Sequence, residues 1–227
     1  MLQEIRPPPP CERYPIVRRS ELRLLAIAGP PVLDPARLPD ACAAAEAGGV
    51  TAIQLRVKQL PAARIMELAL RLRERLTIPL YVNDRADIAL ACGADGVHVG
   101  AEDLPPSAVR ALAGDTLCIG VSVGAEEEVA RALREGADYW SIGSIYRTAT
   151  KADAGTPIGI DGFRTLSASA PEGMTVIAIG GIDAGRVTEV LEAGADGVAV
   201  SQAVFGAPDV ERSARALRRA IERSLGA

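Results

Sequence analysis

Lysine is rare in this chain, and both of its lysines lie beside other polar residues. The 227 residues include 25 lysines and arginines, of which only Lys58 and Lys151 are lysines. Lysine is a compact, mobile point charge, whereas arginine is a rigid planar fork. A lysine kept in an arginine-rich chain therefore marks a position that needs lysine itself, with chance composition as the alternative. Lys58 ends the segment 54–58, and Lys151 follows two threonines in the segment 148–151.

Two carboxylates and three cationic side chains have the composition of a diphosphate site with a divalent metal. Asp84 and Asp103 follow two successive strand-like segments. Mg²⁺ is usually held by one or two carboxylates together with substrate phosphates. Arg56, Lys58 and Lys151 would neutralise the diphosphate charge. As purely structural residues, the two aspartates would cap turns or helices instead.

A second group of residues suits a separate monophosphate. The pair Gly180-Gly181 and the region of Ser201 offer backbone N–H groups where two late strands end. The single histidine, His98, lies inside a predicted strand and completes no Ser-His-Asp set, so it is read as a core residue. The chemistry should therefore rest on positioning and charge stabilisation, without a covalent enzyme intermediate.

The elements that must position these residues alternate regularly along the chain. Apolar, β-branched runs are separated by segments with the spacing of amphipathic helices. The predicted strands are 22–28, 52–58, 79–84, 96–100, 118–123, 139–145, 175–180 and 197–204. Their near-continuous hydrophobicity indicates parallel strands buried on both faces. Eight such units in about 200 residues predict an α/β fold, the (β/α)8 TIM barrel, as a single domain.

An open, doubly wound sheet is the structural alternative to the barrel. We rank it lower because no G-x-G-x-x-G phosphate fingerprint follows the first strand. The barrel should cover residues 21–227, preceded by a proline-rich, flexible extension over residues 1–20. The long segment 146–160 is a candidate lid.

Glycine, proline and aspartate mark the boundaries of several elements. The motif GAD recurs at 93–95, 136–138 and 194–196, each time between a helix and a strand. Its glycine supplies the left-handed residue that ends a helix, and the recurrence indicates a repeated αβ unit. Asp34-Pro35 and Pro105-Pro106 predict helix starts, and Asp183 is expected to cap a helix over 184–193.

The polar residues gather where the barrel would have its active site. That face is formed by the C-terminal ends of the strands, and seven of the eight predicted strands end in polar residues or glycine. Alternation places Gln54, Arg56 and Lys58 on one side of their strand. Inward-facing polar residues are costly unless they meet a polar ligand. The pattern therefore predicts a site for a small phosphorylated molecule.

Composition excludes several other classes of protein. The chain is 48% hydrophobic and 24% charged, with a net charge of −4 and only 3% aromatic residues. This balance argues against nucleic-acid binding. No apolar run reaches the ~18 residues of a membrane span. Without a signal-peptide pattern, and with four cysteines in no metal-binding spacing, the chain is expected in the cytoplasm. A homo-oligomer formed through exposed helix faces is compatible with the sequence.

Six segments of the sequence resemble the thiamine-phosphate synthase family. They are IQLRVK, YVNDRADIALACGADGVHVGAEDLP, IGVSV, TATK, IAIGGI and GVAVSQAVFG, which follow one another from about Leu22 to Phe205. The resemblance implies coupling of 4-amino-2-methyl-5-(diphosphooxymethyl)pyrimidine with 4-methyl-5-(2-phosphooxyethyl)thiazole. The products would be thiamine phosphate and diphosphate, with Mg²⁺ as cofactor.

The resemblance also implies a role for each matching residue. Asp84 and Asp103 would hold Mg²⁺. Lys151, Arg56 and Ser122 would be catalytic. The residues implied for the pyrimidine diphosphate are Gln54, Arg56, Lys58, Asn83, Ser122 and Lys151, and those for the thiazole phosphate are Thr148, Thr150, Gly181, Val200 and Ser201. The implied mechanism is loss of diphosphate to give a pyrimidine carbocation, which the thiazole nitrogen then attacks.

Three departures from the family pattern bear on the alternatives. Residues 28–31 read Ala-Gly-Pro-Pro where the family often has Thr-Asp, Ala101 stands where Gln is common, and Gly124 stands where His is common. Related thiazole tautomerases place their acid–base histidine at that last position, so Gly124 favours the synthase. A non-catalytic thiamine-precursor-binding barrel would have no need of both aspartates and both lysines. Another phosphate-binding barrel isomerase would have no reason to carry QLRxK or TxTK.

Overall fold

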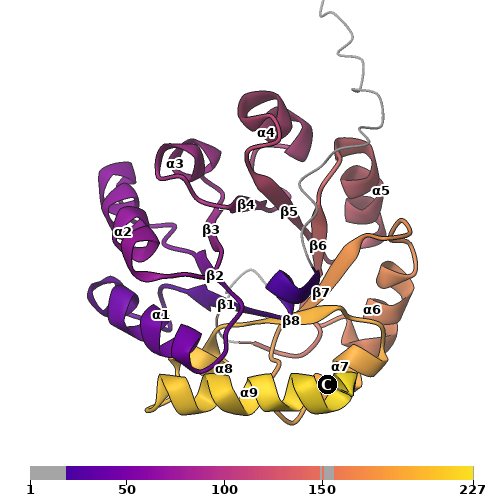
Figure 1. The fold of residues 1–227 in the computed structure, drawn as a ribbon. Helices are drawn as coiled ribbons and strands as arrows, with labels where there is room; N and C mark the ends of the chain where they lie inside the picture. The colour runs from indigo at the N-terminus through magenta and orange to yellow at the C-terminus, as the bar shows by residue number, and fades with distance from the viewer. Residues whose placement is uncertain (1–18, 149, 151–155, 227) are drawn as a thin grey trace, which may run out of the picture.

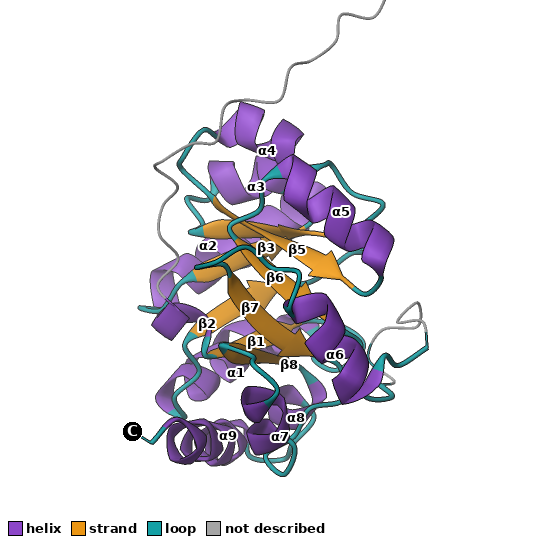
Figure 2. Ribbon diagram, turned by 90° about the vertical axis from the view of Figure 1, so that its right-hand side faces the viewer, coloured by secondary structure: helices purple, strands orange, loops and turns teal. Residues whose placement is uncertain are grey.

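Eight parallel strands close into a barrel in the order in which they occur along the chain. The computed structural model describes residues 19–148, 150 and 156–226. Its strands are β1 Leu24–Ala28, β2 Ala52–Leu55, β3 Leu80–Asn83, β4 Gly96–Val99, β5 Cys118–Val123, β6 Tyr139–Ile142, β7 Thr175–Ile179 and β8 Gly197–Val200. Figure 1 looks at the ring of strands with helices around it, and Figure 2 shows the same layers from the side. The predicted TIM barrel is confirmed.

Helices cover the outside of the barrel. They are α1 Leu38–Ala47, α2 Ala62–Arg75, α3 Ala86–Ala91, α4 Pro106–Ala113, α5 Glu126–Glu135, α6 Gly159–Ser167, α7 Val187–Glu192, α8 Gln202–Phe205 and α9 Val210–Leu225, with 3-10 turns η1 Arg19–Leu22 and η2 Pro35–Arg37. The C-terminal α9 packs against α1, α7 and α8 (Figure 1) and so covers the outside of the barrel where its first and last strands pair. Among the described residues, no helix is long and apolar enough to span a membrane.

Several boundary predictions need correction, and the strands predicted over 52–58 and 139–145 end already at Leu55 and Ile142. The eighth strand ends at Val200 because the chain turns into α8, so the predicted strand over 197–204 is too long. Asp183 accepts hydrogen bonds from the N–H groups of Gly185 and Arg186, but α7 starts only at Val187. The Asp34 side chain caps η2, and Pro106 begins α4.

Strand alternation divides the buried residues into two cores. Residues facing outward pack under the helices, whereas an inner cluster fills the barrel itself. The inner cluster consists of Leu22, Leu25, Ala52, Tyr81, Cys118, Tyr139, Ile177 and Ala199. A Cβ atom on Gly120 would lie 2.0 Å from the Tyr139 ring, so the glycine makes room for that ring. Cys42, Cys92 and Cys118 are buried free thiols, as predicted for core residues, while Cys11 lies outside the described residues.

The GAD motif ties neighbouring strands together at their N-terminal ends. The side chains of Asp95, Asp138 and Asp196 accept the N–H of a residue at the start of the preceding strand, at 2.8, 2.6 and 2.9 Å. These partners are Leu80 in β3, Ile119 in β5 and Val176 in β7. The backbone N–H of each aspartate donates in turn to the carbonyl of that same partner. Thr51 makes the equivalent pair of contacts with Leu24 in β1.

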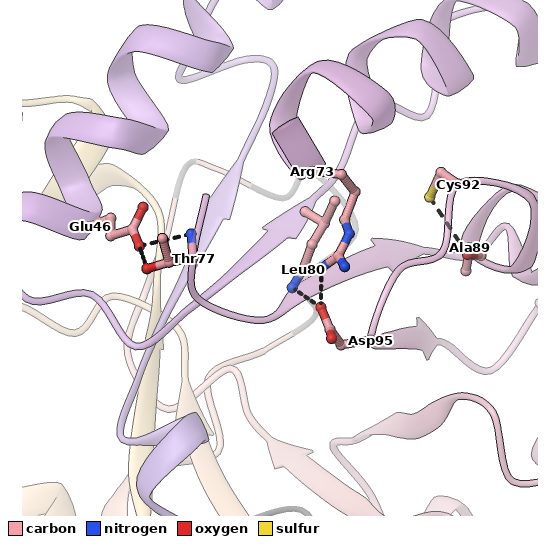
Figure 3. A network of polar contacts seen from close by, with 7 residues as sticks. All are labelled: Glu46, Arg73, Thr77, Leu80, Ala89, Cys92 and Asp95. Atoms are coloured by element: carbon pink, nitrogen blue, oxygen red, sulfur yellow. Dashed lines mark hydrogen bonds and ion pairs between the residues drawn. The ribbon is translucent and has the colours of Figure 1, made fainter. Parts of the chain in front are cut away.

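Each aspartate of the motif also pairs with an arginine. Asp95 lies 2.8 Å from Arg73 (Figure 3), and Asp138 lies 2.6 Å from Arg110. The third, Asp196, lies 3.1 Å from Arg19. The repeat predicted from the glycines is therefore also a repeat of carboxylates that hold β3 to β4, β5 to β6 and β7 to β8. These contacts lie at the end of the barrel opposite the predicted active site.

Replacing Asp138 by alanine should destabilise the fold far more than the same change at Asp95. The Asp138 side chain is 2% exposed and its arginine partner 13%, whereas Asp95 is 43% exposed. Removing one partner of a buried pair costs about 3 kcal/mol, while an exposed pair with one backbone bond contributes about 1 kcal/mol. Urea unfolding of Asp138→Ala and Asp95→Ala would measure the two losses. Equal losses would contradict the role of burial.

Candidate active site

A large cavity opens at the C-terminal ends of the strands. Its volume is about 180 Å³, and its lining includes residues from the ends of all eight strands. Every predicted site residue that the structure describes lies in this lining: Gln54, Arg56, Lys58, Asn83, Asp84, Asp103, Ser122, Thr148, Thr150, Gly181, Val200 and Ser201. Lys151 lies outside the described residues. The lid predicted over 146–160 lies partly outside them.

The second strand sends three polar side chains into the cavity at increasing height. Gln54, within β2, is 2% exposed. Arg56 and Lys58 follow the last residue of the strand, and the Arg56 N–H still bonds the Ala28 carbonyl of β1 at 2.8 Å. This bond continues the strand pairing by one residue. The alternation predicted for 54, 56 and 58 therefore holds, with the amide deepest and Lys58 at the mouth.

A lysine and two aspartates form the charged part of the site. Lys58 Nζ lies 3.0 Å from Asp84 Oδ2, and the side chains of Asp84 and Asp103 hydrogen-bond each other. Asp103 Oδ2 also accepts the Gly100 N–H at 2.7 Å. The sequence placed these three residues after different strands, and the barrel brings them together.

The environment separates the pKa values of the two carboxyls. Burial raises the pKa of Asp84, and the hydrogen bond with Asp103 raises it further. Burial also acts to raise the pKa of Asp103, but its hydrogen bonds with Asp84 and the Gly100 N–H bring that pKa below its ordinary value. Asp84 therefore holds a proton more readily than Asp103 does.

Asp84 has a strained backbone conformation that suits a functional residue. Its φ of 64° is the only positive value at a non-glycine residue among those described. Such a conformation costs about 1 kcal/mol or more and persists where the surroundings fix it. The Asp84 N–H donates to the His98 carbonyl at 2.8 Å, which anchors it to β4. The fold thus holds this carboxylate in place despite the strain.

One polar group beside the carboxylates lacks a partner within the described part of the chain. The Asn83 amide nitrogen is buried and has no hydrogen-bond partner there, although Asn83 lines the cavity. An unsatisfied buried N–H costs about 1–3 kcal/mol. A bound molecule with an acceptor atom, such as a ring nitrogen, would satisfy it.

His98 and Ser141 line the cavity but are absent from the predicted site. His98 is 7% exposed, with Nε2 3.0 Å from Ser122 Oγ and Nδ1 3.0 Å from the Tyr139 hydroxyl. Its prediction as a hydrogen-bonded core histidine is confirmed, but it also reaches the site. Strand alternation carries the signal that would have found it, because His98 shares the inward side with Gly96 and Gly100.

The threonines and the late strands form the other side of the cavity. Thr148 Oγ1 accepts the Thr150 N–H at 3.2 Å. The loop before them is fixed at Tyr146, whose hydroxyl donates to Glu189 in α7 and whose ring lies 4.4 Å from the Arg186 guanidinium. Because β7 and β8 lie across the closed barrel from β3 and β4, Gly181 and Ser201 face the charged side.

The candidate metal ligands are two carboxylates, a number that fits Mg²⁺ better than a structural transition metal. No cluster of three or more His, Cys, Asp or Glu residues able to hold a metal occurs in the described ranges. Mg²⁺ commonly uses one or two carboxylates and completes its shell with water and phosphate oxygens. Asp84 and Asp103 contact each other, and Asp84 pairs with Lys58, so a bound cation could take the place of the lysine.

Comparisons with known proteins identify close similarity over most of the chain. A family model described as thiamine monophosphate synthase matches residues 24–204. A thiamine-phosphate synthase from Moorella thermoacetica is 47% identical over 79% of this chain and 86% of its own length. One from Agrobacterium fabrum is 39% identical over 93% of this chain and 99% of its own. The solved thiamine phosphate pyrophosphorylase from Pyrococcus furiosus has a TM-score of 0.83 at 37% identity. The match covers 92% of this chain and 99% of that protein.

A methyl group at Gly181 should disturb the site, and Gly159 offers a matched control. Both glycines have positive φ, 64° and 69°, so alanine at either should cost about 1 kcal/mol in backbone strain. At Gly181 the new Cβ would also lie 2.7 Å from the Arg147 carbonyl oxygen, whereas nothing lies within 4 Å at Gly159. In chemical unfolding, Gly181→Ala should therefore lose about 1–3 kcal/mol more free energy of unfolding than Gly159→Ala. Equal losses in the two variants would show that the contact with the Arg147 carbonyl is absent.

Proposed function

The chain belongs to the thiamine monophosphate synthase family and is an enzyme of that transferase class, and we propose the reaction it catalyses and the residues responsible. It couples 4-amino-2-methyl-5-(diphosphooxymethyl)pyrimidine with 4-methyl-5-(2-phosphooxyethyl)thiazole and releases diphosphate. The observation that carries this proposal is one cavity with cations and carboxylates on one side and the β7–β8 loops on the other. Two phosphorylated substrates, one bound on each side of the cavity, can meet there.

The diphosphate of the pyrimidine substrate binds on the β2–β4 side. Arg56 offers a planar fork for phosphate oxygens, and Lys58 offers a mobile charge at the mouth. Asp84 and Asp103 would hold Mg²⁺, which when bound would neutralise charge on the diphosphate. Lys58 would then exchange its contact with Asp84 for one with a phosphate. The acidic residues and the cations thus serve the same leaving group.

The pyrimidine ring occupies the deeper part of the cavity. The unsatisfied Asn83 N–H group matches a ring nitrogen, and Gln54 offers a second amide close to the floor. These contacts would fix the methylene carbon that carries the diphosphate. Positioning of this kind is a main source of rate acceleration when no covalent intermediate forms.

The reaction proceeds by separation of charge. The bond between the methylene carbon and the diphosphate oxygen breaks, and its electron pair leaves with the diphosphate. Arg56, Lys58 and the Ser122 hydroxyl stabilise the departing charge. The ring amino group delocalises the positive charge on the carbon, and the thiazole nitrogen then donates its lone pair to form the C–N bond. No proton leaves that nitrogen, which fits a site without an evident general base.

The thiazole phosphate binds on the β6–β8 side. Thr148 and Thr150 would contact the thiazole, while the backbone at Gly181 and the Val200-Ser201 pair would hold its phosphate. We also propose that the protein is located in the cytoplasm.

The thiazole tautomerase alternative lacks its acid–base residue in this chain. Gly124 follows β5 at the position of the expected histidine, and its N–H bonds Glu128 Oε2 at 2.5 Å. The chain's only histidine is His98, which lies in β4 and contacts Ser122 and Tyr139. The site therefore favours coupling over tautomerisation.

A coupling assay with and without Mg²⁺ tests the proposed reaction. The thiamine phosphate formed would be oxidised to fluorescent thiochrome phosphate and quantified. We expect Mg²⁺-dependent product from the wild type and a loss of about 100-fold or more in Asp84→Asn. Asp87→Asn is the matched control, because Asp87 is an exposed residue of α3 paired with Arg85. No product from folded protein that binds the thiazole phosphate would overturn the proposal.

Lys151 should act on the departing diphosphate more than on the thiazole. Lys151→Ala is therefore expected to lower kcat by about 100-fold while changing the affinity for the thiazole phosphate little. Steady-state kinetics and calorimetric titration of the thiazole phosphate would separate the two effects. An unchanged kcat would remove Lys151 from the catalytic set.

A further inference from the structure

Four polar side chains form a chain of hydrogen bonds from the floor of the cavity to Ser122. The Gln54 side chain bonds the Tyr139 hydroxyl, which lies 3.0 Å from His98 Nδ1. His98 Nε2 lies 3.0 Å from Ser122 Oγ. The residues come from β2, β6, β4 and β5, so that only the closed barrel brings them together.

These groups are buried in a barrel interior that is otherwise largely apolar. Tyr139 is fully buried, and Gln54 and His98 are 2% and 7% exposed. Buried polar groups are costly unless each finds a partner, and a satisfied network fixes its members in one arrangement. The open space above Gly120 accommodates the Tyr139 ring.

The contacts define a direction for the chain of hydrogen bonds. Burial keeps the pKa of Tyr139 well above its ordinary value, and His98 Nδ1 lies 3.0 Å from the phenol oxygen. The phenol therefore keeps its proton and can donate it to His98 Nδ1. A neutral imidazole that accepts at Nδ1 carries its own proton on Nε2. That N–H donates to Ser122 Oγ, which leaves the serine proton for the cavity.

We propose that Tyr139 and His98 are positioning residues that turn the Ser122 hydroxyl into a hydrogen-bond donor toward the departing diphosphate. This inference rests on the proposed coupling reaction, because it assigns Ser122 to the leaving group. With the other tautomer, Ser122 would donate to Nε2 and present its lone pairs to an anion. The direction of the chain therefore decides whether Ser122 attracts or repels the developing charge.

The single histidine makes the direction measurable without any assay of activity. Because the chain contains one histidine, the untagged full-length protein labelled with ¹⁵N-histidine gives the spectrum of His98 alone. The ¹⁵N chemical shifts distinguish the two neutral tautomers from the imidazolium. We expect the Nε2–H tautomer at neutral pH in the wild type. In Tyr139→Phe the donor to Nδ1 is lost, so the population should shift toward Nδ1–H.

Tyr81→Phe is the matched control for the loss of a buried phenol. Tyr81 lies in the same inner cluster, with its ring edge-on to Tyr139 at a centroid distance of 5.7 Å. Its hydroxyl hydrogen-bonds Cys118 and not the imidazole. Tyr81→Phe should therefore leave the tautomer and the coupling rate unchanged while removing the same atom from the same interior.

Kinetics test whether the chain acts through Ser122. Tyr139→Phe should lower kcat about tenfold with little change in KM, and Ser122→Ala should lower it further. When Tyr139→Phe is added to Ser122→Ala, it should have no additional effect, because residues that act through one group are not additive. Full additivity of the two changes, or equal effects of Tyr139→Phe and Tyr81→Phe, would overturn the proposal.

The spectrum also separates this inference from the proposed function. An Nδ1–H tautomer or an imidazolium in the wild type would overturn the directed chain whatever the enzyme's activity. An Nε2–H tautomer that moves in Tyr139→Phe would support the directed chain even in a protein that fails to couple the two substrates. That failure would count against the proposed reaction and against Ser122 as a donor to diphosphate.

Discussion

Closure of the eight-stranded parallel sheet is the constraint on which the rest of the structure depends. Each strand pairs with two neighbours, so the sheet has no free edge and all inward-facing residues share one interior. Because the strands are parallel, the inward positions at their C-terminal ends converge on a single cavity. Residues far apart in sequence, such as Lys58 and Asp103, become part of one site for this reason. The separate polar segments acquire a common function only through this geometry.

The two ends of the barrel use carboxylates for different purposes. At the N-terminal ends, the aspartates of the GAD repeat accept backbone N–H groups and pair with arginines, and so join successive strands. At the C-terminal ends, Asp84 and Asp103 contact each other and a lysine at the mouth of a cavity. The first arrangement engages each aspartate with partners inside the fold. The second leaves charged groups facing the cavity, at the cost of a strained backbone at Asp84.

The barrel interior changes from apolar to polar along its axis. Leucine, isoleucine and alanine fill its lower part together with two tyrosine rings, whereas amide, imidazole and hydroxyl groups lie at the cavity floor. A polar layer of this kind stabilises the fold only if its hydrogen bonds are satisfied. The contacts of His98 with Tyr139 and Ser122 meet that requirement and also fix the orientation of groups that face the ligand. Stability and positioning are thus properties of the same bonds.

The sequence by itself determined the number and order of the strands, the inward side of residues 54, 56 and 58, and the set of polar residues at the strand ends. These features follow from local periodicity and from short signals such as the glycine of GAD, which a linear pattern carries. The tertiary structure decided which polar groups meet. The Lys58–Asp84–Asp103 cluster, the strand-joining role of the GAD aspartates and the contacts of His98 all depend on the relative positions of different strands. Sequence spacing does not encode those positions, because they are set by the register and closure of the sheet. The short helix α8 was missed because its apolar residues continue the strand pattern, while in the structure it packs against α9.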